Sequence, residues 1–315
     1  MNILCLTFRI FIKKEEKMTS RVWLILYLCA IGGVLGASEQ STEKDQKAPE
    51  KNPQIIISSL PDNIKLIIGQ TKDKFYVPRV KAIHALPANM PQDQIDACYE
   101  FLYQKLDSQS LPDLQFNGLK NELVFALMKQ RKKPAELAGH LVKMYKDKSF
   151  DTTWRDYCVQ FFGKWYPNAP DNQGRKDMVA GLWDALKNER GTRIAGAASS
   201  QLCFLSRKYS EFSKDDVSAA SLDALTDPAC ANISKVPLLQ TCAILGNEKA
   251  LPVARKIAAV ERDPLLRASA IAAIGILGNK DDLNFLRELE TSKDMRIQKP
   301  AKAAIEKILF RLDKK

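Results

Sequence analysis

Few residues of the kind that build metal and catalytic sites occur in this sequence. Only two histidines are present among its 315 residues, His84 and His140, and they fall on separate predicted helices without a ligand-spaced companion. The sequence has neither a glycine-rich phosphate loop nor a nucleophile elbow. We therefore expect no metal, no cofactor and no catalytic residue set, and we predict that the protein is not an enzyme. An active site made of ordinary residues is the alternative.

The cysteines do not define a disulfide framework. Five of them follow residue 37, so at least one is expected to be free. Cys203 and Cys242 fall in nearly the same register on successive predicted helices, and Cys230 competes as a partner for either. Close packing between helices explains these small side chains equally well, so we predict no bridge.

Long apolar runs are also scarce. The clearest, residues 22–31, leads into a small-residue stretch at 32–37 and is typical of a secretory signal peptide. It is shorter than the ~20 residues that a spanning helix needs. We predict a signal peptide over residues 1–37, with Met18 as an alternative start, and a secreted or periplasmic protein. If the leader is not cleaved, membrane contact is expected through the leader alone.

Residues 38–54 contain almost nothing to bury, which predicts a disordered polar linker. The remaining residues, 55–315, are dominated by a phrase that recurs every thirty to forty residues. In its clearest copy, at 263–278, Leu266, Ala270, Ala273, Ile274 and Leu277 fall on one stripe at spacings of three and four, which indicates a buried helical face.

Strand signals are rare, so we predict an all-α fold of about seven helix pairs. The first helices are expected at 61–69, 92–106, 134–145, 175–186, 215–225, 251–260 and 283–289. The second helices begin near a basic residue in six copies: Arg79, Lys120, Arg155, Arg193, Lys235 and Arg267. A seventh copy spans 298–305.

The order Asp263-Pro264, Arg267, then Ala270 and Ala273 resembles the second helix of a HEAT repeat, particularly the short bacterial kind also found in phycobilin lyases. The resemblance is best over 74–86 and 251–309. It implies an armadillo-like α-α superhelix, a solenoid of antiparallel helix pairs whose second helices line a concave face. Such proteins usually act as scaffolds or binding platforms, and the fold by itself implies no chemistry.

The six basic residues have two interpretations. The resemblance implies that the turn Asp and the following Arg fasten neighbouring repeats, and Asp263 with Arg267 and Asp151 with Arg155 have that spacing. The alternative is a positive stripe that binds an acidic partner. We favour the structural interpretation.

Six aromatic residues lie between 154 and 166 at helical spacing, which favours packing in the core. Trp165 and Tyr166 stand beside a proline-rich break, so we expect these two to be the most exposed. If so, they would offer an anchor of the kind enriched in binding hot spots.

The functional hypothesis is an exported scaffold that binds a protein partner through its concave helical face. Five basic and two acidic residues precede Ala37, so the net charge falls from +11 to +8 without them and still favours anionic partners. The main alternative is a basic solenoid that binds an acidic polysaccharide or DNA, because some alkylpurine DNA glycosylases consist of HEAT-like repeats. The leader argues against nucleic acid, and more strongly against a third possibility, a phycobilin lyase, because export would remove the protein from pigment assembly.

Overall fold

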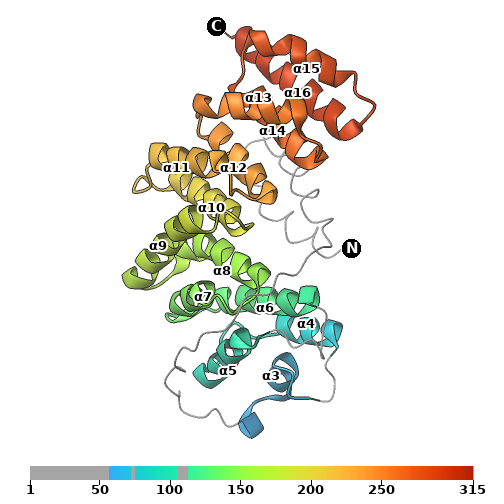
Figure 1. The fold of residues 1–315 in the computed structure, drawn as a ribbon. Coiled ribbons are helices and arrows are strands. Elements are labelled where there is room, and N and C mark those ends of the chain that lie inside the picture. The colour runs from blue at the N-terminus through green and yellow to red at the C-terminus, as the bar shows by residue number, and fades with distance from the viewer. Residues whose placement is uncertain (1–56, 72–74, 106–112, 315) are drawn as a thin grey trace.

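The computed structural model of the protein describes residues 57–71, 75–105 and 113–314. These residues form fourteen α-helices joined by turns and short 3-10 helices, and they contain no strand (Figure 1). The all-α prediction is therefore confirmed. Within the described residues, no helix is long and apolar enough to cross a membrane. The predicted signal peptide, 1–37, and the predicted linker, 38–54, lie outside the described residues.

The helices alternate along the chain between two rows. The odd-numbered row contains α3 (Asp62–Ile67), α5 (Gln92–Tyr103), α7 (Leu137–Lys146), α9 (Asn172–Asn188), α11 (Lys214–Thr226), α13 (Leu251–Val260) and α15 (Leu283–Glu290). The even-numbered row contains α4 (Tyr76–His84), α6 (Asp113–Met128), α8 (Thr152–Trp165), α10 (Ile194–Lys208), α12 (Asn232–Ile244), α14 (Pro264–Leu277) and α16 (Met295–Leu312). Each odd-numbered helix contacts the even-numbered helix that follows it.

These helices occupy the positions that the apolar spacing predicts, and α13 has the predicted bounds. Polar side chains set several starts. Asp151 accepts hydrogen bonds from the backbone N of Thr153 and Trp154 at 3.0 Å, and Asp263 caps α14 in the same way. Acidic residues also lie at a helix start in α11, where Asp215 and Asp216 are in the first turn and complement the helix dipole.

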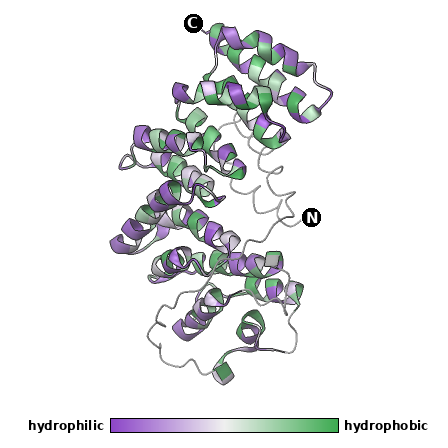
Figure 2. Cartoon of the chain, in the orientation of Figure 1, coloured by the Kyte–Doolittle hydropathy of each residue, from purple (hydrophilic) through white to green (hydrophobic). Residues whose placement is uncertain are grey.

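Contacts between successive even-numbered helices run without a break from α4 to α16. Figure 1 shows that this row is curved. In the part of the chain from α3 to α12, its hollow, concave side faces away from the odd-numbered helices. Each helix mixes hydrophobic and hydrophilic residues (Figure 2), and the core fills the space between the two rows. The arrangement is consistent with a helical repeat.

Small residues allow even-numbered helices to approach closely. A Cβ atom on Gly196 of α10 would lie 2.5 Å from Cγ of Pro237 on α12, and one on Gly275 of α14 would lie 2.7 Å from Cα of Ala304 on α16. Such distances leave no room for a methyl group without a shift of one helix. Glycine therefore sets the spacing of the row at these two positions.

Candidate functional site

Four of the six basic residues on the second helices donate hydrogen bonds to the end of the helix before them. The carbonyl groups in the last turn of a helix have no partner within that helix, so a donor from outside stabilises them. The acceptors are the backbone oxygens of Ile67, Gln104, Tyr145 and Ala258, at or beside the ends of α3, α5, α7 and α13. The contact therefore joins the two helices of one pair.

Arg79 makes the clearest of these contacts. Its Nε and Nη2 atoms donate to the oxygen of Ile67 at 3.0 and 2.6 Å, and its guanidinium carbon lies 5.0 Å from the centre of the Phe101 ring. Only 3% of the residue is exposed, and burial lowers its pKa to about 10. Arg79 is therefore a core residue and presents no charge to a partner.

Lys120 is buried to a similar degree, with 1% exposed. Its Nζ atom donates to the oxygen of Gln104 and lies about equally far from three aromatic rings, 4.8 Å from Phe116, 5.1 Å from Phe150 and 5.0 Å from Trp154. Burial lowers its pKa to about 8, and the charge of Asp151 partly offsets this. The surrounding rings replace much of the water that the ammonium group would otherwise bind.

Arg155 links two successive pairs. Its Nε atom donates to the oxygen of Tyr145 at 2.8 Å, and its Nη2 atom forms an ion pair with Glu189, the residue that follows α9. Asp151 also reaches a neighbouring pair, because it accepts a hydrogen bond from Nδ2 of Asn117 on α6 at 2.9 Å. The expected fastening between repeats is present at this turn. At Asp263 the carboxylate caps α14 and Arg267 stays within its own pair.

The predicted register is wrong at Arg193. Four of the other basic residues lie one turn inside their helices, and Lys120 lies about two turns inside α6. Arg193 is instead the residue before α10, and Ala197 holds the position one turn inside that helix. Its Nε atom lies 3.2 Å from Oδ2 of Asp156 on α8. Among the described residues, Lys235 donates no hydrogen bond to a preceding helix; its Nζ atom donates to Oδ1 of Asn232 at 2.9 Å. The sequence pattern, a basic residue followed by small residues, therefore does not predict which of the six basic residues donates a hydrogen bond to the preceding helix.

The prediction for Trp165 is wrong. Trp165 is 0% exposed, and its Nε1 atom has no hydrogen-bond partner in the described part of the chain. The neighbouring proline-rich break packs over it, because Ala169 is also fully buried and donates its backbone N–H to the oxygen of Trp165 at 2.9 Å. Trp154, Phe161 and Phe162 are buried as well, so the core interpretation of this aromatic cluster is confirmed.

Tyr166 is half-buried and lines an open groove between α9 and α11, with a volume of about 730 Å³. Its ring packs edge-on against Phe212 at 5.3 Å, and its hydroxyl donates to Oε1 of Glu211 at 3.0 Å. Trp183 on α9 also lines this groove. Tyr166 therefore keeps an exposed edge that a partner can reach, although its polar atom already has an internal partner.

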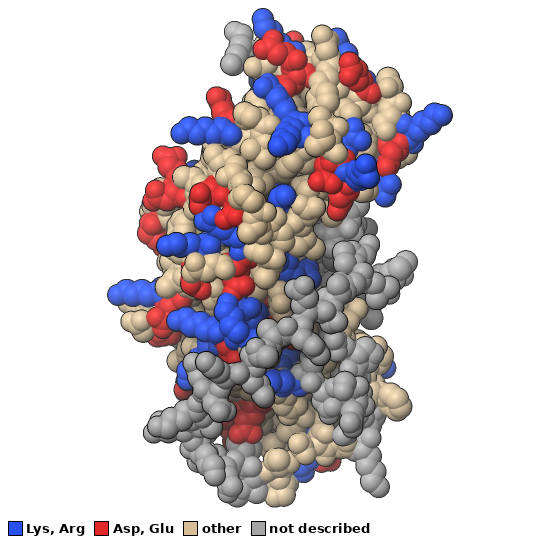
Figure 3. Space-filling view, viewed as in Figure 1, with Lys and Arg blue, Asp and Glu red and all other residues tan. Residues whose placement is uncertain are grey.

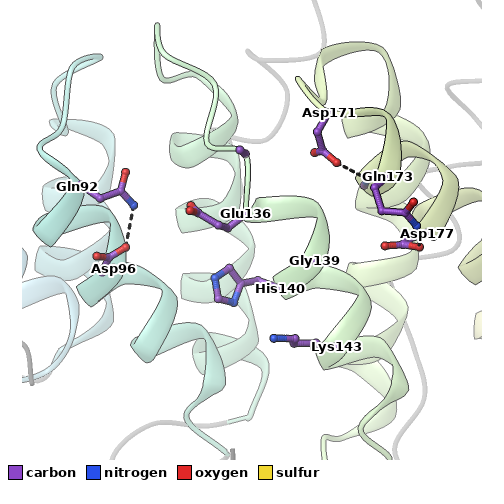
Figure 4. Close-up of a pocket in the computed structure, with 11 residues that line it drawn as sticks. Gln92, Asp96, Glu136, Gly139, His140, Lys143, Asp171, Gln173 and Asp177 are labelled. Atoms are coloured by element: carbon purple, nitrogen blue, oxygen red, sulfur yellow. Dashed lines mark hydrogen bonds between the residues drawn. The ribbon is translucent and has the colours of Figure 1, made fainter. Parts of the chain in front are cut away.

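A second groove, of about 580 Å³, lies on the same row between α5, α7 and α9. Figure 4 shows four carboxylates around it, Asp96, Glu136, Asp171 and Asp177, with His140 and Lys143 near its centre. Three of the carboxylates already accept hydrogen bonds within their own helix. Asp96 accepts from Gln92 and Asp177 from Gln173, each at 2.8 Å, and Asp171 caps α9 by accepting from the backbone N of Gly174.

Both histidines are engaged within the fold. The Nδ1 atom of His140 lies 3.0 Å from the hydroxyl of Tyr103, and its ring stacks on Tyr99 with centres 4.0 Å apart. Burial lowers the pKa of His140 to about 4, and Lys143 contributes to the shift. The Nε2 atom of His84 lies 2.8 Å from Oε2 of Glu122. No group of three potential metal ligands occurs among the described residues.

The described cysteines are all buried and free: Cys98, Cys158, Cys203, Cys230 and Cys242. Burial raises the pKa of the Cys98 and Cys242 thiols to about 12. A thiol is nucleophilic only as the thiolate, so these side chains are suited to packing.

The exposed side of the even-numbered row offers the most continuous surface. Its helices contact each other on two sides and the odd-numbered helices on a third, which leaves one stripe of side chains on the hollow side. We call this stripe the inner face. It consists of Gln160 and Lys164 on α8, Gln201, Phe204, Arg207 and Lys208 on α10, Gln240 and Ile244 on α12, and Ile276 on α14.

Phe204 and Lys164 are the notable side chains of the inner face. Phe204 is 46% exposed, and Nζ of Lys208 lies 5.7 Å from its ring centre. The Nζ atom of Lys164 lies 5.1 Å from the ring centre of Phe125 and 5.3 Å from that of Phe161. Sequence reasoning missed both residues, because it followed the basic residues at helix starts. The pairing of Phe204 with Lys208, four residues later, was the available signal.

A buried carboxylate lies beneath the inner face. Asp156 is 2% exposed, accepts a hydrogen bond from Nε2 of Gln160 at 3.0 Å, and pairs with Arg193. Burial raises its pKa to about 6, and Arg193 and Gln160 partly offset this. Asp156 thus joins α8 to the start of α10 without adding negative charge to the surface.

No protein-family model matches this sequence, and no curated protein matches it. Among solved structures, the crystal structure of an engineered protein is 19% identical and aligns over 80% of this chain and 98% of its own, with a TM-score of 0.24. A likeness this weak carries no argument about fold or function.

Proposed function

We propose that this protein is an exported, non-enzymatic scaffold of HEAT-like repeats that binds a protein partner through the inner face. The helix pairs would form an α-α superhelix, with the even-numbered helices on the concave side. The observation that carries this proposal is the unbroken series of contacts from α4 to α16, which holds exposed residues of successive helices in one fixed surface. Such surfaces suit extended partners.

The internal contacts of the basic residues support the same proposal. Arg79, Lys120 and Arg155 are buried and hydrogen-bonded, so they would contribute stability rather than contacts to a partner. Binding would then depend on exposed residues that are not part of the repeating sequence pattern, such as Phe204 and Lys208. Such a division, with buried residues that stabilise the fold and exposed residues that bind, would suit a family whose members share one fold and bind different partners.

Export is proposed on the apolar run at 22–31 and the small residues after it. Mass spectrometry of the native protein from fractionated cells, after mild crosslinking, tests export and binding together. We expect a mature N-terminus near Ala37, recovery outside the cytoplasm, and one reproducible protein companion. An intact leader in the cytoplasm with nucleic acid attached would contradict the proposal.

A further inference from the structure

The even-numbered helices at the centre of the protein expose no carboxylate. The segments of α10, α12 and α14 contain no Asp or Glu at all, and the only carboxylate of α8 is the buried Asp156. Four successive helices therefore present a surface without negative charge.

The odd-numbered helices at the same level differ. Exposed or half-exposed carboxylates are present on α9 at Asp177 and Asp184 and on α11 at Asp215, Asp216 and Asp223. Figure 3 shows acidic side chains along the left edge of the molecule, where α9 and α11 lie, mixed with basic ones. The lack of carboxylates is thus a property of these four helices and does not follow from the composition of the whole chain.

Three exposed cations accompany this lack, Lys164 on α8 and Arg207 and Lys208 on α10. None of them forms an ion pair with a described residue, and the Nζ atoms of Lys164 and Lys208 lie over aromatic rings. Gln201 on α10 packs against Gly163 on α8, which brings the end of α8 beside the middle of α10, one turn before Phe204. Lys208 thus lies at the exposed ring of Phe204, and Lys164 lies on the neighbouring helix.

We propose that the inner face binds an acidic protein segment that also carries large apolar side chains. Glutamate or aspartate side chains of the segment would pair with Lys164, Arg207 and Lys208. An apolar side chain would cover Phe204, and others would reach Ile244 and Ile276 further along the row. This inference rests on the proposed function and adds the chemistry of the partner.

A protein segment fits these residues better than a nucleic acid does. Binding to a phosphate backbone needs many cations spaced along a path. Here Arg79, Lys120 and Arg155 are buried, and the part of the inner face on α12 and α14 presents Ile244 and Ile276 instead of charge. Apolar side chains next to cations match a partner that has both kinds of group.

Fluorescence anisotropy with the full chain tests this inference. The probe is a labelled 16-residue amphipathic peptide of glutamate and leucine, and the matched control has lysine in place of every glutamate. A single-stranded DNA of 16 nucleotides serves as an anion without apolar side chains. We expect the acidic peptide to bind at least tenfold more tightly than either, and its affinity to fall as the salt concentration rises.

Variants locate the binding. The combined substitution Lys164→Glu, Arg207→Glu and Lys208→Glu is expected to raise Kd for the acidic peptide at least tenfold, and Phe204→Ser is expected to do the same. The control Lys187→Glu, on an exposed position of α9, should change Kd less than twofold. Circular dichroism checks that each variant is folded.

No binding of the acidic peptide, equal binding of the basic peptide, or tighter binding of the DNA would overturn the inference. So would variants of the inner face that bind like the wild type. If a native partner is nevertheless crosslinked at Phe204, the proposed function stands and only the acidic chemistry is wrong.

Discussion

Nε of Arg267 donates a hydrogen bond to the backbone oxygen of Ala258 at 2.8 Å and so fixes the start of α14 against the end of α13. Arg79, Lys120 and Arg155 make the equivalent contact in three other pairs. A basic side chain in the first two turns of the second helix thus recurs because it completes the hydrogen bonds at the end of the first helix. These basic residues recur because the fold requires them, so we expect the contacts with a partner to come from other positions.

The first prediction concerns this contact. Arg79→Met should lower the free energy of unfolding by about 1–3 kcal/mol, because the oxygen of Ile67 loses both of its hydrogen bonds in a buried setting. Arg207→Met, at an exposed position without an ion pair, should change it by less than about 0.5 kcal/mol. Urea titration followed by circular dichroism measures both. Equal effects would contradict the structural role.

The aromatic cluster gives the second prediction. Trp165→Ala should lower the free energy of unfolding by about 3–5 kcal/mol, because it leaves a large cavity in the core. Tyr166→Ala removes a half-buried ring and should cost clearly less. Thermal unfolding of the two variants checks this order, and a Trp165→Ala protein as stable as the wild type would show that the indole is not buried.

The third prediction uses pH. The pKa of Asp156 in the folded chain, about 6, lies above the ordinary value of 3.8, so between pH 4 and 6 the folded state binds more protons than the unfolded state. Stability from this group is therefore lost as the pH rises through that window. Asp156→Asn cannot titrate, so it should gain about 1–3 kcal/mol relative to the wild type between pH 4 and 7.

Unfolding of the wild type and Asp156→Asn in guanidinium chloride at several pH values measures this difference. A constant offset between the two proteins across the range would mean that Asp156 titrates normally.

Two glycines give the fourth prediction. Gly196→Ala should lower the free energy of unfolding by about 1–3 kcal/mol, because the added methyl group would meet Pro237 and Ser234 on α12. Gly139→Ala on α7 meets nothing within 4 Å and should raise it by up to about 1 kcal/mol, since alanine favours a helix. Thermal unfolding measures the stability of both variants. If Gly196→Ala and Gly139→Ala change the stability in the same direction, the close approach of α10 and α12 is contradicted.

Local patterns in the sequence predict the helices well. The apolar stripe of 266–277 and the capping residue Asp263 depend only on neighbours in the chain, and α14 forms where they place it. The same reasoning fails for Trp165, because its burial depends on residues that fold back over it after the helix ends. Exposure at the end of a helix is set by tertiary packing.

An internal repeat shows the limit of local reasoning more closely. Two four-residue segments have the same sequence, Ile244-Leu245-Gly246-Asn247 and Ile276-Leu277-Gly278-Asn279. Gly246 has a φ of 74° and ends α12 in the left-handed region, whereas Gly278 has a φ of −72°. At Gly278 a Cβ atom would lie 2.5 Å from Oδ2 of Asp282, which accepts the backbone N–H of Asn279. The carboxylate of Asp282 is fixed by Arg255, whereas the earlier copy has Ala250 at the equivalent position.

The inner face could have been found from the sequence only in part. The sequence alone shows that Asp and Glu are absent from residues 194–208, 232–244 and 264–277. That these segments lie side by side, with Phe204 exposed among cations, depends on how the pairs stack.

Site-specific photocrosslinking in native cells tests the central claim most directly. A photoreactive amino acid replaces Phe204 on the inner face in one strain and the exposed Ala219 on α11 in another. The account predicts a covalent adduct to the same protein in each replicate from position 204 and none from position 219. Adducts from position 219 alone would place the binding surface on the odd-numbered row and contradict the account.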